Sequence, residues 1–495
     1  MSNENKHGAI LIAAFVANSI LNYGFSVMLS WYLNPAEFGM LGVAQSLLLL
    51  SGMAVGSGFA WTTAHDIALS GVCEESRQSF RSSWVANTSL GVFLAGAFWV
   101  MYTSRFLPFG PNYFLIILFV GLTTVLLAIR SVFTGALRGL FRFGSLSVNL
   151  VIEVVIKIGV GLALVVGGFG VPGVLIGFAC GTLAALLHCL WMLKSERLWS
   201  WGGRFDRRVI WMTIPFFLGM VGPSLIMNLD ILGLKLFAPA SLADQMAGLY
   251  QGAAILARTP VFIAQALGMV FFSYALGRYA REGRWEVFDH LSAAMRAWLR
   301  LLLPIALGLI LAPQAALTIF YPASYHQMSG TLQLAAAGGA LLALAVLFTG
   351  ILQATEDRFR PALVTTIAVM VQITVLVIAL PQGGIITAAL SLFAGGLVAV
   401  IGLMPSVYRL SKPSLPKPGI SRLLHLARIG FPYVCLAIPL LVLPDGGRAA
   451  QFLKFLIAGC GYCLALLLIH PVRSDIPDRP VKRQIMQLVN VLLGG

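Results

Sequence analysis

The chain has few charged residues. Only 10% of its 495 residues are Asp, Glu, Lys or Arg, whereas 59% are hydrophobic. The mean hydropathy of +0.89 lies outside the range of soluble domains. Fourteen apolar runs are long enough to cross the roughly 30 Å hydrocarbon core. The sequence therefore predicts an all-α polytopic membrane protein with about fourteen transmembrane helices. The predicted spans are 8–33, 40–65, 84–104, 113–135, 146–167, 171–193, 210–238, 248–277, 298–320, 331–355, 361–381, 385–408, 424–443 and 450–470.

Acidic residues, histidines and cysteines are also scarce. The 18 Asp and Glu residues stand against 33 Lys and Arg, which gives a formal net charge of +15. The seven histidines show no metal-ligand spacing, and the six cysteines form no disulfide pattern. The Cys460-x-x-Cys463 spacing occurs in metal and redox sites, but two thiols in one apolar helix are more often packing residues. We therefore expect no metal and no cofactor.

Long outer loops are missing as well. The connections on the outer side have at most about ten residues. A membrane-bound glycan polymerase or ligase needs acid, base or metal ligands that converge, usually on a sizeable outer loop. The sequence thus argues against an enzyme.

The basic residues are distributed unevenly across the membrane. With the N-terminus inside, 26 of the 33 Lys and Arg fall in cytoplasmic segments, four lie in predicted spans and three lie outside: Arg105, Arg448 and Lys454. This positive-inside signal predicts that both termini are cytoplasmic. Because the basic residues occupy eight short segments, we expect them to contact anionic membrane lipids rather than nucleic acid.

Six charged residues interrupt the predicted spans: Arg130, Glu153, Lys157, Asp230, Lys235 and Arg258. A charge at the centre of a bilayer costs about 2.5 kcal/mol or more, so such residues usually face a watery cavity or a partner. Four are basic and two are acidic, and this excess favours an anionic cargo. Arg130 and Lys235 lie near helix ends, where a long side chain can instead extend to the interface. Glu153 and Asp230 are the candidate carriers if a proton or sodium gradient drives transport.

Helical spacing places Asn149, Glu153 and Lys157 on one stripe of the span 146–167. Lys157 lies about 16 Å from the cytoplasmic end, close to the midplane. One interpretation is a cavity-lining stripe that binds phosphate or relays protons. The alternative is a self-neutralised Glu153–Lys157 pair that holds this helix to a neighbour.

The span 248–277 carries Gln251, Arg258 and Gln265 on one face, seven residues apart. Arg258 precedes Pro260, and a proline inside a spanning helix often bends it at a cavity. Because arginine keeps its charge and grips phosphate with a planar fork, Arg258 is the preferred candidate for a phosphate site. The alternative is a structural contact to Glu153 or Asp230.

Two asparagines four residues apart, Asn18 and Asn22, lie on the first predicted helix. They line the cavity in one interpretation and hydrogen-bond across helices in the other.

The chain contains an internal repeat. Phe133-Thr-Gly-Ala-Leu-Arg138 matches Phe348-Thr-Gly-Ile-Leu-Gln353 at an offset of 215 residues. Two further matches occur in the same order, Asn34-Pro35…Phe38-Gly39 with Ala238-Pro239…Ala247-Gly248 and Gly170-Val-Pro-Gly with Gly384-Ile-Ile-Thr.

Each copy holds six helices, an even number, so both copies insert with the same orientation. We expect an axis along the membrane normal, with the substrate route between the copies. The predicted parts are an N-terminal lobe at 1–195 (helices 1–6), a C-terminal lobe at 196–411 (helices 7–12), and a linker, a helical hairpin (helices 13–14) and a cytoplasmic tail at 412–495.

These motifs carry a family resemblance. The segments Asn18-Ser-Ile-Leu-Asn22 and Leu33-Asn-Pro-Ala-Glu-Phe-Gly-Met-Leu-Gly-Val-Ala44 resemble the start of bacterial polysaccharide flippases. The turn Gly139-Leu-Phe-Arg-Phe143 and the Gly170-Val-Pro-Gly173 helix start also fit. These flippases transport O-antigen and exopolysaccharide units and form the polysaccharide branch of the multidrug/oligosaccharidyl-lipid/polysaccharide (MOP) exporter superfamily.

The resemblance covers roughly residues 8–410. It implies two six-helix lobes around a central cavity and transport by alternating access in the bacterial inner membrane. The implied cargo is an undecaprenyl-pyrophosphate-linked glycan, and polysaccharide polymerase or export machinery would be partners. The rival function is a multidrug or cation antiporter of the same superfamily, which needs acidic residues in its cavity. The basic excess favours the flippase.

Overall fold

All regular structure in the described part of the computed structural model is helical. That part comprises residues 3–104, 109–196, 198, 205–265, 267–268, 294–353, 359–410, 420–444 and 446–469. Within it, ten helices are long and apolar enough to cross a membrane. The predicted all-α polytopic membrane fold is confirmed, and the count of fourteen spans stays a prediction.

The first half of the chain forms α1 (Asn3–Tyr32), α2 (Pro35–Ser57), α3 (Phe59–Ser70), α4 (Glu74–Thr103), α5 (Tyr113–Gly139), α6 (Phe143–Val166), α7 (Gly170–Leu193), α8 (Arg208–Phe237) and α9 (Ala243–Ala257). The second half forms α12 (Leu303–Leu311), α13 (Pro313–Phe320), α14 (Ser329–Gln353), α15 (Phe359–Gly383), α16 (Ile385–Leu410), α17 (Ile420–Val442) and α18 (Arg448–Ile469). A π-helical turn, Trp298–Leu302, precedes α12, and a 3₁₀ turn, Ala323–Met328, precedes α14.

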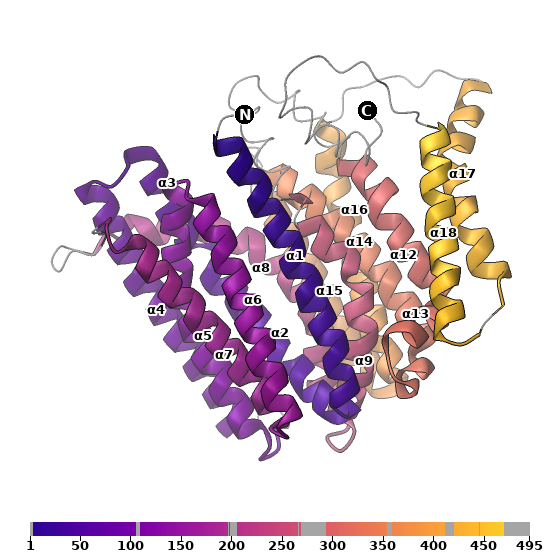
Figure 1. The fold of residues 1–495 in the computed structure, drawn as a ribbon, viewed down its shortest axis with the longest axis horizontal. Helices are drawn as coiled ribbons and strands as arrows, with labels where there is room; N and C mark the ends of the chain where they lie inside the picture. Colours follow the sequence, from indigo (N-terminus) through magenta and orange to yellow (C-terminus); the bar gives the residue numbers. More distant parts are fainter. Residues whose placement is uncertain are drawn as a thin grey trace. The chain divides into compact units, whose positions relative to one another are not determined.

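The chain divides into two compact units. The first unit comprises residues 2–251 and 376–388, and the second comprises 252–375 and 389–495. In the first unit α4, α5, α6 and α7 pack together, α1 lies against α6, and α8 lies against α2 (Figure 1). In the second unit α12 packs on α14 and α17, and α17 and α18 form a hairpin (Figure 1). The lobe boundaries at 195 and 411 stay a prediction, while the linker 412–418 and the tail after residue 469 lie outside the described residues.

The Asn34-Pro35-Ala-Glu37 turn, part of the motif that carried the resemblance, is a helix cap. The side chain of Asn34 accepts the Glu37 amide at 2.9 Å, and the Glu37 carboxylate accepts the Asn34 amide at 3.1 Å. Pro35 occupies the first turn of α2, where no amide donor is needed. This reciprocal capping satisfies two of the donors that a helix start leaves open. The motif therefore fixes the residue at which α2 begins.

Two glycines with positive φ stand at matching points of the repeat. Gly170, with φ +53°, begins α7, and Gly384, with φ +61°, immediately precedes α16. Glycine adopts this left-handed conformation without the steric penalty that Cβ imposes. The sequence match between these two segments therefore reflects the same need for a glycine with positive φ at both positions.

Replacing Gly384 with alanine is expected to destabilise the protein by about 1–2 kcal/mol. A Cβ at this position meets nothing within 4 Å, so the penalty arises from the backbone conformation alone. Thermal unfolding of the detergent-purified protein measures it. Gly159→Ala is the matched control, because Gly159 lies inside α6 and also has open space around it; it should be neutral or stabilising. Equal melting temperatures for the two variants would contradict the prediction.

Candidate functional site

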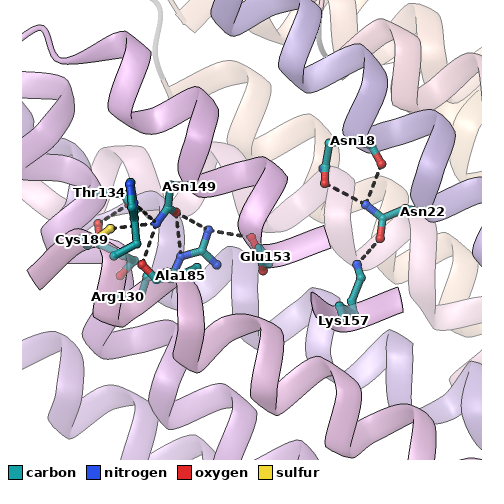
Figure 2. A network of polar contacts seen from close by, with 11 residues as sticks. Asn18, Asn22, Arg130, Thr134, Asn149, Glu153, Lys157, Ala185 and Cys189 are labelled. Carbon is teal, nitrogen blue, oxygen red and sulfur yellow. Dashed lines mark hydrogen bonds and ion pairs between the residues drawn. The ribbon is translucent and has the colours of Figure 1, made fainter. Parts of the chain in front are cut away.

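Arg130 on α5 is the centre of a polar network inside the first unit (Figure 2). Its Nη2 lies 2.7 Å from Oε2 of Glu153 on α6 and 3.0 Å from Oδ1 of Asn149, to which Nε also donates at 3.3 Å. The Arg130 side chain is 9% exposed and that of Glu153 is 22% exposed. The alternative in which Arg130 extends to the membrane interface is therefore wrong, because its charge is compensated within the helix bundle.

Asn149 extends the network from α6 to α7. Its Nδ2 donates to the carbonyl oxygen of Ala185 at 2.6 Å and lies 3.2 Å from Sγ of Cys189. The close approach of these two helices depends on Gly181 of α7, where an added Cβ would lie 2.6 Å from the Glu153 carbonyl oxygen. One asparagine thus serves as acceptor for α5 and donor for α7, and the three helices are held by a single set of bonds.

Lys157 lies one turn further along α6 and has a different environment. Its Nζ donates to Oδ1 of Asn22 on α1, and Asn22 in turn donates to the Asn18 carbonyl oxygen at 2.8 Å and to its Oδ1 at 3.2 Å (Figure 2). Nζ also lies 4.9 Å from the centre of the Phe178 ring. Lys157 is buried, and no described carboxylate lies within 4 Å of its Nζ.

The predicted ion pair between Glu153 and Lys157 is not formed. Spacing of four residues brings two side chains to one helix face, but it does not fix which neighbour each one contacts. The guanidinium group of Arg130 on α5 lies opposite Glu153 and pairs with its carboxylate. The long Lys157 side chain points instead toward α1. The alternative interpretation, in which the two groups neutralise each other, is therefore wrong.

Asn18 and Asn22 are both half-buried and lie beside the Lys157 ammonium group. The bond from Lys157 to Asn22 crosses from α6 to α1, so this asparagine does form an interhelical contact. Both asparagines keep part of their surface accessible.

Lys235 forms a second buried charge cluster at the other end of the first unit. Its Nζ lies 2.6 Å from Oδ1 of Asp244, which also accepts the Tyr113 hydroxyl at 2.5 Å. The ammonium lies 4.4 Å from the centre of the Tyr113 ring. The side chain of Lys235 is 1% exposed and paired with Asp244, so the alternative in which it extends to the interface is not what the structure shows.

Asp230 and Gln251 are also buried in the first unit. The Tyr250 hydroxyl donates to Oδ2 of Asp230 at 2.7 Å, joining α9 to α8. Gln251 donates to Oε1 of Gln45 on α2 at 3.1 Å. Both predicted site residues therefore contact a neighbouring helix rather than each other.

Arg258 and Gln265 belong to the second unit. Arg258 is 4% exposed and occupies a turn between the end of α9 at Ala257 and the helical residues around Pro260. The amides of Val261 and Phe262 both donate to the Arg258 carbonyl oxygen, at 2.9 and 3.1 Å. The interruption expected at Pro260 is thus observed two residues earlier, at the arginine itself, because proline provides no amide for the preceding turn.

Sequence reasoning missed several partners of the predicted residues, among them Phe178, Tyr113, Asp244 and Tyr250. Asp244 lies just outside a predicted span and was therefore not counted among the intramembrane charges. The aromatic residues carry no sequence signal for a polar role, since aromatic side chains are common throughout apolar helices. The described residues also contain no cluster of three or more His, Cys, Asp or Glu that could hold a metal ion.

Comparison with solved structures identifies the class of fold. A structure of the lipid II flippase MurJ in an inward closed conformation is similar at a TM-score of 0.72 and 14% identity, covering 93% of this chain and 99% of that one. An inward-facing multidrug resistance MATE family transporter of the MOP superfamily is similar at a TM-score of 0.60 and 14% identity, covering 82% of this chain and 100% of that one. A MOP superfamily transporter from Pyrococcus furiosus is similar at a TM-score of 0.58 and 15% identity, covering 83% of this chain and 97% of that one. The protein thus has the fold of MOP superfamily transporters and is a multi-pass membrane protein.

The family follows from the sequence itself. A family model described as polysaccharide biosynthesis protein matches residues 28–330, more than half of the chain. The chain belongs to this polysaccharide biosynthesis protein family. No curated protein matches the sequence significantly. The resemblance inferred from the capped turn and the repeat is confirmed at the level of family and fold.

Breaking the Arg130–Glu153 pair from either side is expected to destabilise the protein by about 3–5 kcal/mol, because one charge is left buried without its partner. Arg130→Met, Glu153→Gln and the double variant form a thermodynamic cycle that thermal unfolding can measure. The double variant should lose less than the sum of the singles.

The exposed pair Arg77–Glu74 provides the control for this cycle. Its closest atoms are 3.7 Å apart and the Glu74 side chain is 74% exposed, so Glu74→Gln should cost less than about 1 kcal/mol. Additive losses for Arg130 and Glu153 would show that the two groups do not interact.

Proposed function

We propose that the protein is a non-enzymatic flippase of the bacterial inner membrane with both termini in the cytoplasm. It moves undecaprenyl-pyrophosphate-linked oligosaccharide or polysaccharide repeat units from the cytoplasmic to the outer leaflet by alternating access. The flipped unit is then available to a polysaccharide polymerase or export machinery. Membership in the polysaccharide biosynthesis family and the transporter fold support this assignment.

The observation that carries the proposal is the environment of Lys157. Arg130 and Lys235 each have a carboxylate in direct contact. The direct contacts of Lys157 are instead the neutral Asn22 amide and the Phe178 ring, and the Glu153 carboxylate acts on it only from beyond 4 Å. An amide oxygen and an aromatic face stabilise a buried ammonium less than a carboxylate does. An arriving anion therefore gains most at Lys157. A lipid-linked diphosphate supplies such an anion on a molecule that stays in the bilayer.

The groups around Lys157 suit such a ligand. The half-buried Asn18 and Asn22 offer amide donors to phosphate or sugar oxygens, and Asn22 can release Lys157 when phosphate replaces it. Arg130 belongs to the separate network that includes Glu153 and Asn149, and it acts on Lys157 only through its charge, so its role is to set the local potential. We propose Arg258 of the second unit as a phosphate ligand, with Gln265 of the same unit and Gln251 of the first unit as polar contacts to the glycan.

A cation antiporter is the second candidate, and the same network argues against it. Such a transporter needs a carboxylate that is available to a cationic substrate. Glu153 is engaged by Arg130, and Asp230 is fully buried beside Tyr250. We therefore assign Asp230, and less directly Glu153, to coupling with a proton or sodium ion rather than to cargo binding.

Replacing Lys157 with methionine is expected to slow flipping at least about tenfold. A charge-assisted hydrogen bond contributes about 1.5–3 kcal/mol, and methionine keeps the length of the side chain without the charge. Lys157→Arg should retain most of the activity. The measurement is flipping of a fluorescent undecaprenyl-pyrophosphate sugar in proteoliposomes, detected with a membrane-impermeant quencher. Arg258→Ala should give a loss of similar size.

Lys194→Met is the matched control, because Lys194 is exposed just after α7 and stacks on Trp191. It should flip the lipid at the wild-type rate. Normal flipping by Lys157→Met would remove this residue from the site. A wild-type protein that exports a cationic dye along an ion gradient and does not flip the lipid would favour the antiporter.

Asp230→Asn is expected to abolish stimulation of flipping by an imposed proton or sodium gradient, while slow flipping without a gradient continues. Asparagine can still accept the Tyr250 hydroxyl, so the local packing is kept, but it neither binds a proton nor carries charge. Flipping is compared with and without each gradient in the same vesicles. Glu74→Gln, which changes an exposed carboxylate, should remain stimulated. Persistent stimulation of Asp230→Asn would assign coupling to another group.

A further inference from the structure

A cavity of about 370 Å³ lies between α4, α5 and α7, wholly within the first unit. Helices α4 and α7 both pack on α5 (Figure 1), and the cavity lies between them. Its floor consists of buried apolar side chains, among them Phe80 of α4, Phe133 of α5 and Leu193 of α7. Sites for small molecules have volumes of about 300–1,000 Å³, so the cavity is large enough to hold part of a ligand.

The mouth of the cavity adjoins an apolar surface that the bilayer covers. Ile129 at the mouth is partly exposed, and Leu190 is 41% exposed. Helical spacing continues this surface along α5 to Leu122 and Leu118, which are 47% and 45% exposed. Exposed apolar side chains of a membrane-spanning helix contact lipid chains. A lipid chain therefore reaches the cavity without leaving the bilayer.

The depth of the cavity corresponds to one leaflet. Trp84 lies about 15 Å from the start of α4 at Glu74, and Ile129 lies about 15 Å from the end of α5 at Gly139. Lys194 directly follows the last residue of α7. The proposed topology puts these three helix ends at the cytoplasmic surface. Because half of the roughly 30 Å hydrocarbon core is also about 15 Å, the lining extends from the headgroup region toward the midplane.

The two walls of the cavity each carry a basic residue toward the cytoplasmic end. Lys194 of the α7 wall lines the cavity, and no described carboxylate lies within 4 Å of its Nζ. Arg77 shares one face of α4 with Phe80 and Trp84 and lies one turn nearer the cytoplasm. Its ion pair with Glu74 is long, at 3.7 Å, and its Nε is buried without a hydrogen-bond partner among the described residues. An apolar slot thus ends beside two cations that can accept an anionic group.

We propose that this cavity binds one anionic phospholipid of the cytoplasmic leaflet. An acyl chain fills the apolar space over Phe133, and Lys194 and Arg77 hold the phosphate by charge-assisted hydrogen bonds. Basic pockets between membrane helices on the cytoplasmic side recognise anionic headgroups in this way. A lysine that serves only to orient the chain in the membrane needs no apolar cavity beside it. The bound lipid is neither the cargo nor a coupling ion, and its binding is measured without either.

Filling the cavity tests whether an acyl chain enters it. Ile129→Trp should weaken binding of the first phosphatidylglycerol molecule at least about tenfold, because excluding about two methylene groups has an effect of this size. Native mass spectrometry of the detergent-purified protein, titrated with this lipid, measures the affinity. Leu190→Trp narrows the same cavity from α7 and should repeat the loss, so a folding defect in one variant does not decide the result.

Leu122→Trp is the matched control for these substitutions. Leu122 lies on the same exposed surface of α5 but outside the cavity. A tryptophan at this position should leave phosphatidylglycerol binding at the wild-type level.

Removing the cations tests recognition of the headgroup. Lys194→Met and Arg77→Met should each weaken phosphatidylglycerol binding about fivefold, whereas binding of phosphatidylcholine, which has no net charge, should change little. Arg409→Met is the matched control, because Arg409 is exposed in the last turn of α16 in the second unit. It removes the same charge and should bind both lipids as the wild type does.

Equal affinities of the wild type for phosphatidylglycerol and phosphatidylcholine would overturn the proposal. Wild-type binding by both Ile129→Trp and Leu190→Trp would also overturn it. Undecaprenyl phosphate is the third probe: if it binds more tightly than phosphatidylglycerol and Ile129→Trp removes that binding, the cavity belongs to the lipid tail of the cargo instead. The transport function is tested separately, because Lys194→Met is expected to flip the cargo at the wild-type rate.

Discussion

Compensation of positive charge inside the membrane is the constraint on which the first unit depends. A lone charge in hydrocarbon is costly, so the helices that carry its partners must stay adjacent. Glu153 holds α6 against α5 through Arg130, and Asp244 holds the start of α9 against α8 and α5 through Lys235 and Tyr113. Lys157 is the exception, because its direct contacts are the neutral Asn22 amide and the Phe178 ring, and the Glu153 carboxylate acts on it only from beyond 4 Å. The same rule that fixes the helices thus marks the place where an anionic ligand would complete the charge balance.

The first unit combines two kinds of helix contact with different mechanical consequences. Between α5, α6 and α7, a network of directional bonds meets at Asn149, and separating these helices would leave several polar groups unsatisfied. Between α2 and α9, the backbones touch through Gly39 and Gly248, and the Lys235–Asp244 ion pair lies nearby. The two kinds of contact therefore differ in what holds them, which is directional side-chain bonding in one case and close backbone approach in the other.

Several features of the fold could be predicted from particular residues. The apolar runs identified the membrane class, and the matches at Gly170 and Gly384 identified a repeat whose helix starts share a left-handed glycine. The Asn34–Glu37 turn was recognisable because a capping box depends on residues three apart, which a sequence displays directly. The partners of the buried charges were not predictable in the same way. Helical spacing suggested Glu153 with Lys157, whereas Arg130 from α5 takes Glu153 and Asn22 from α1 takes Lys157.

The sequence by itself determined the local and periodic properties of this protein: which segments are apolar enough to enter the membrane, where helices begin, and that the chain is duplicated. Each depends on neighbours along the chain. The tertiary structure alone decided which charges are compensated and which backbones touch, because these depend on how each helix is rotated about its axis and on what the next helix presents. Gly39 and Gly248 illustrate both, since their equivalence is visible in the repeat and their contact is visible only in the fold.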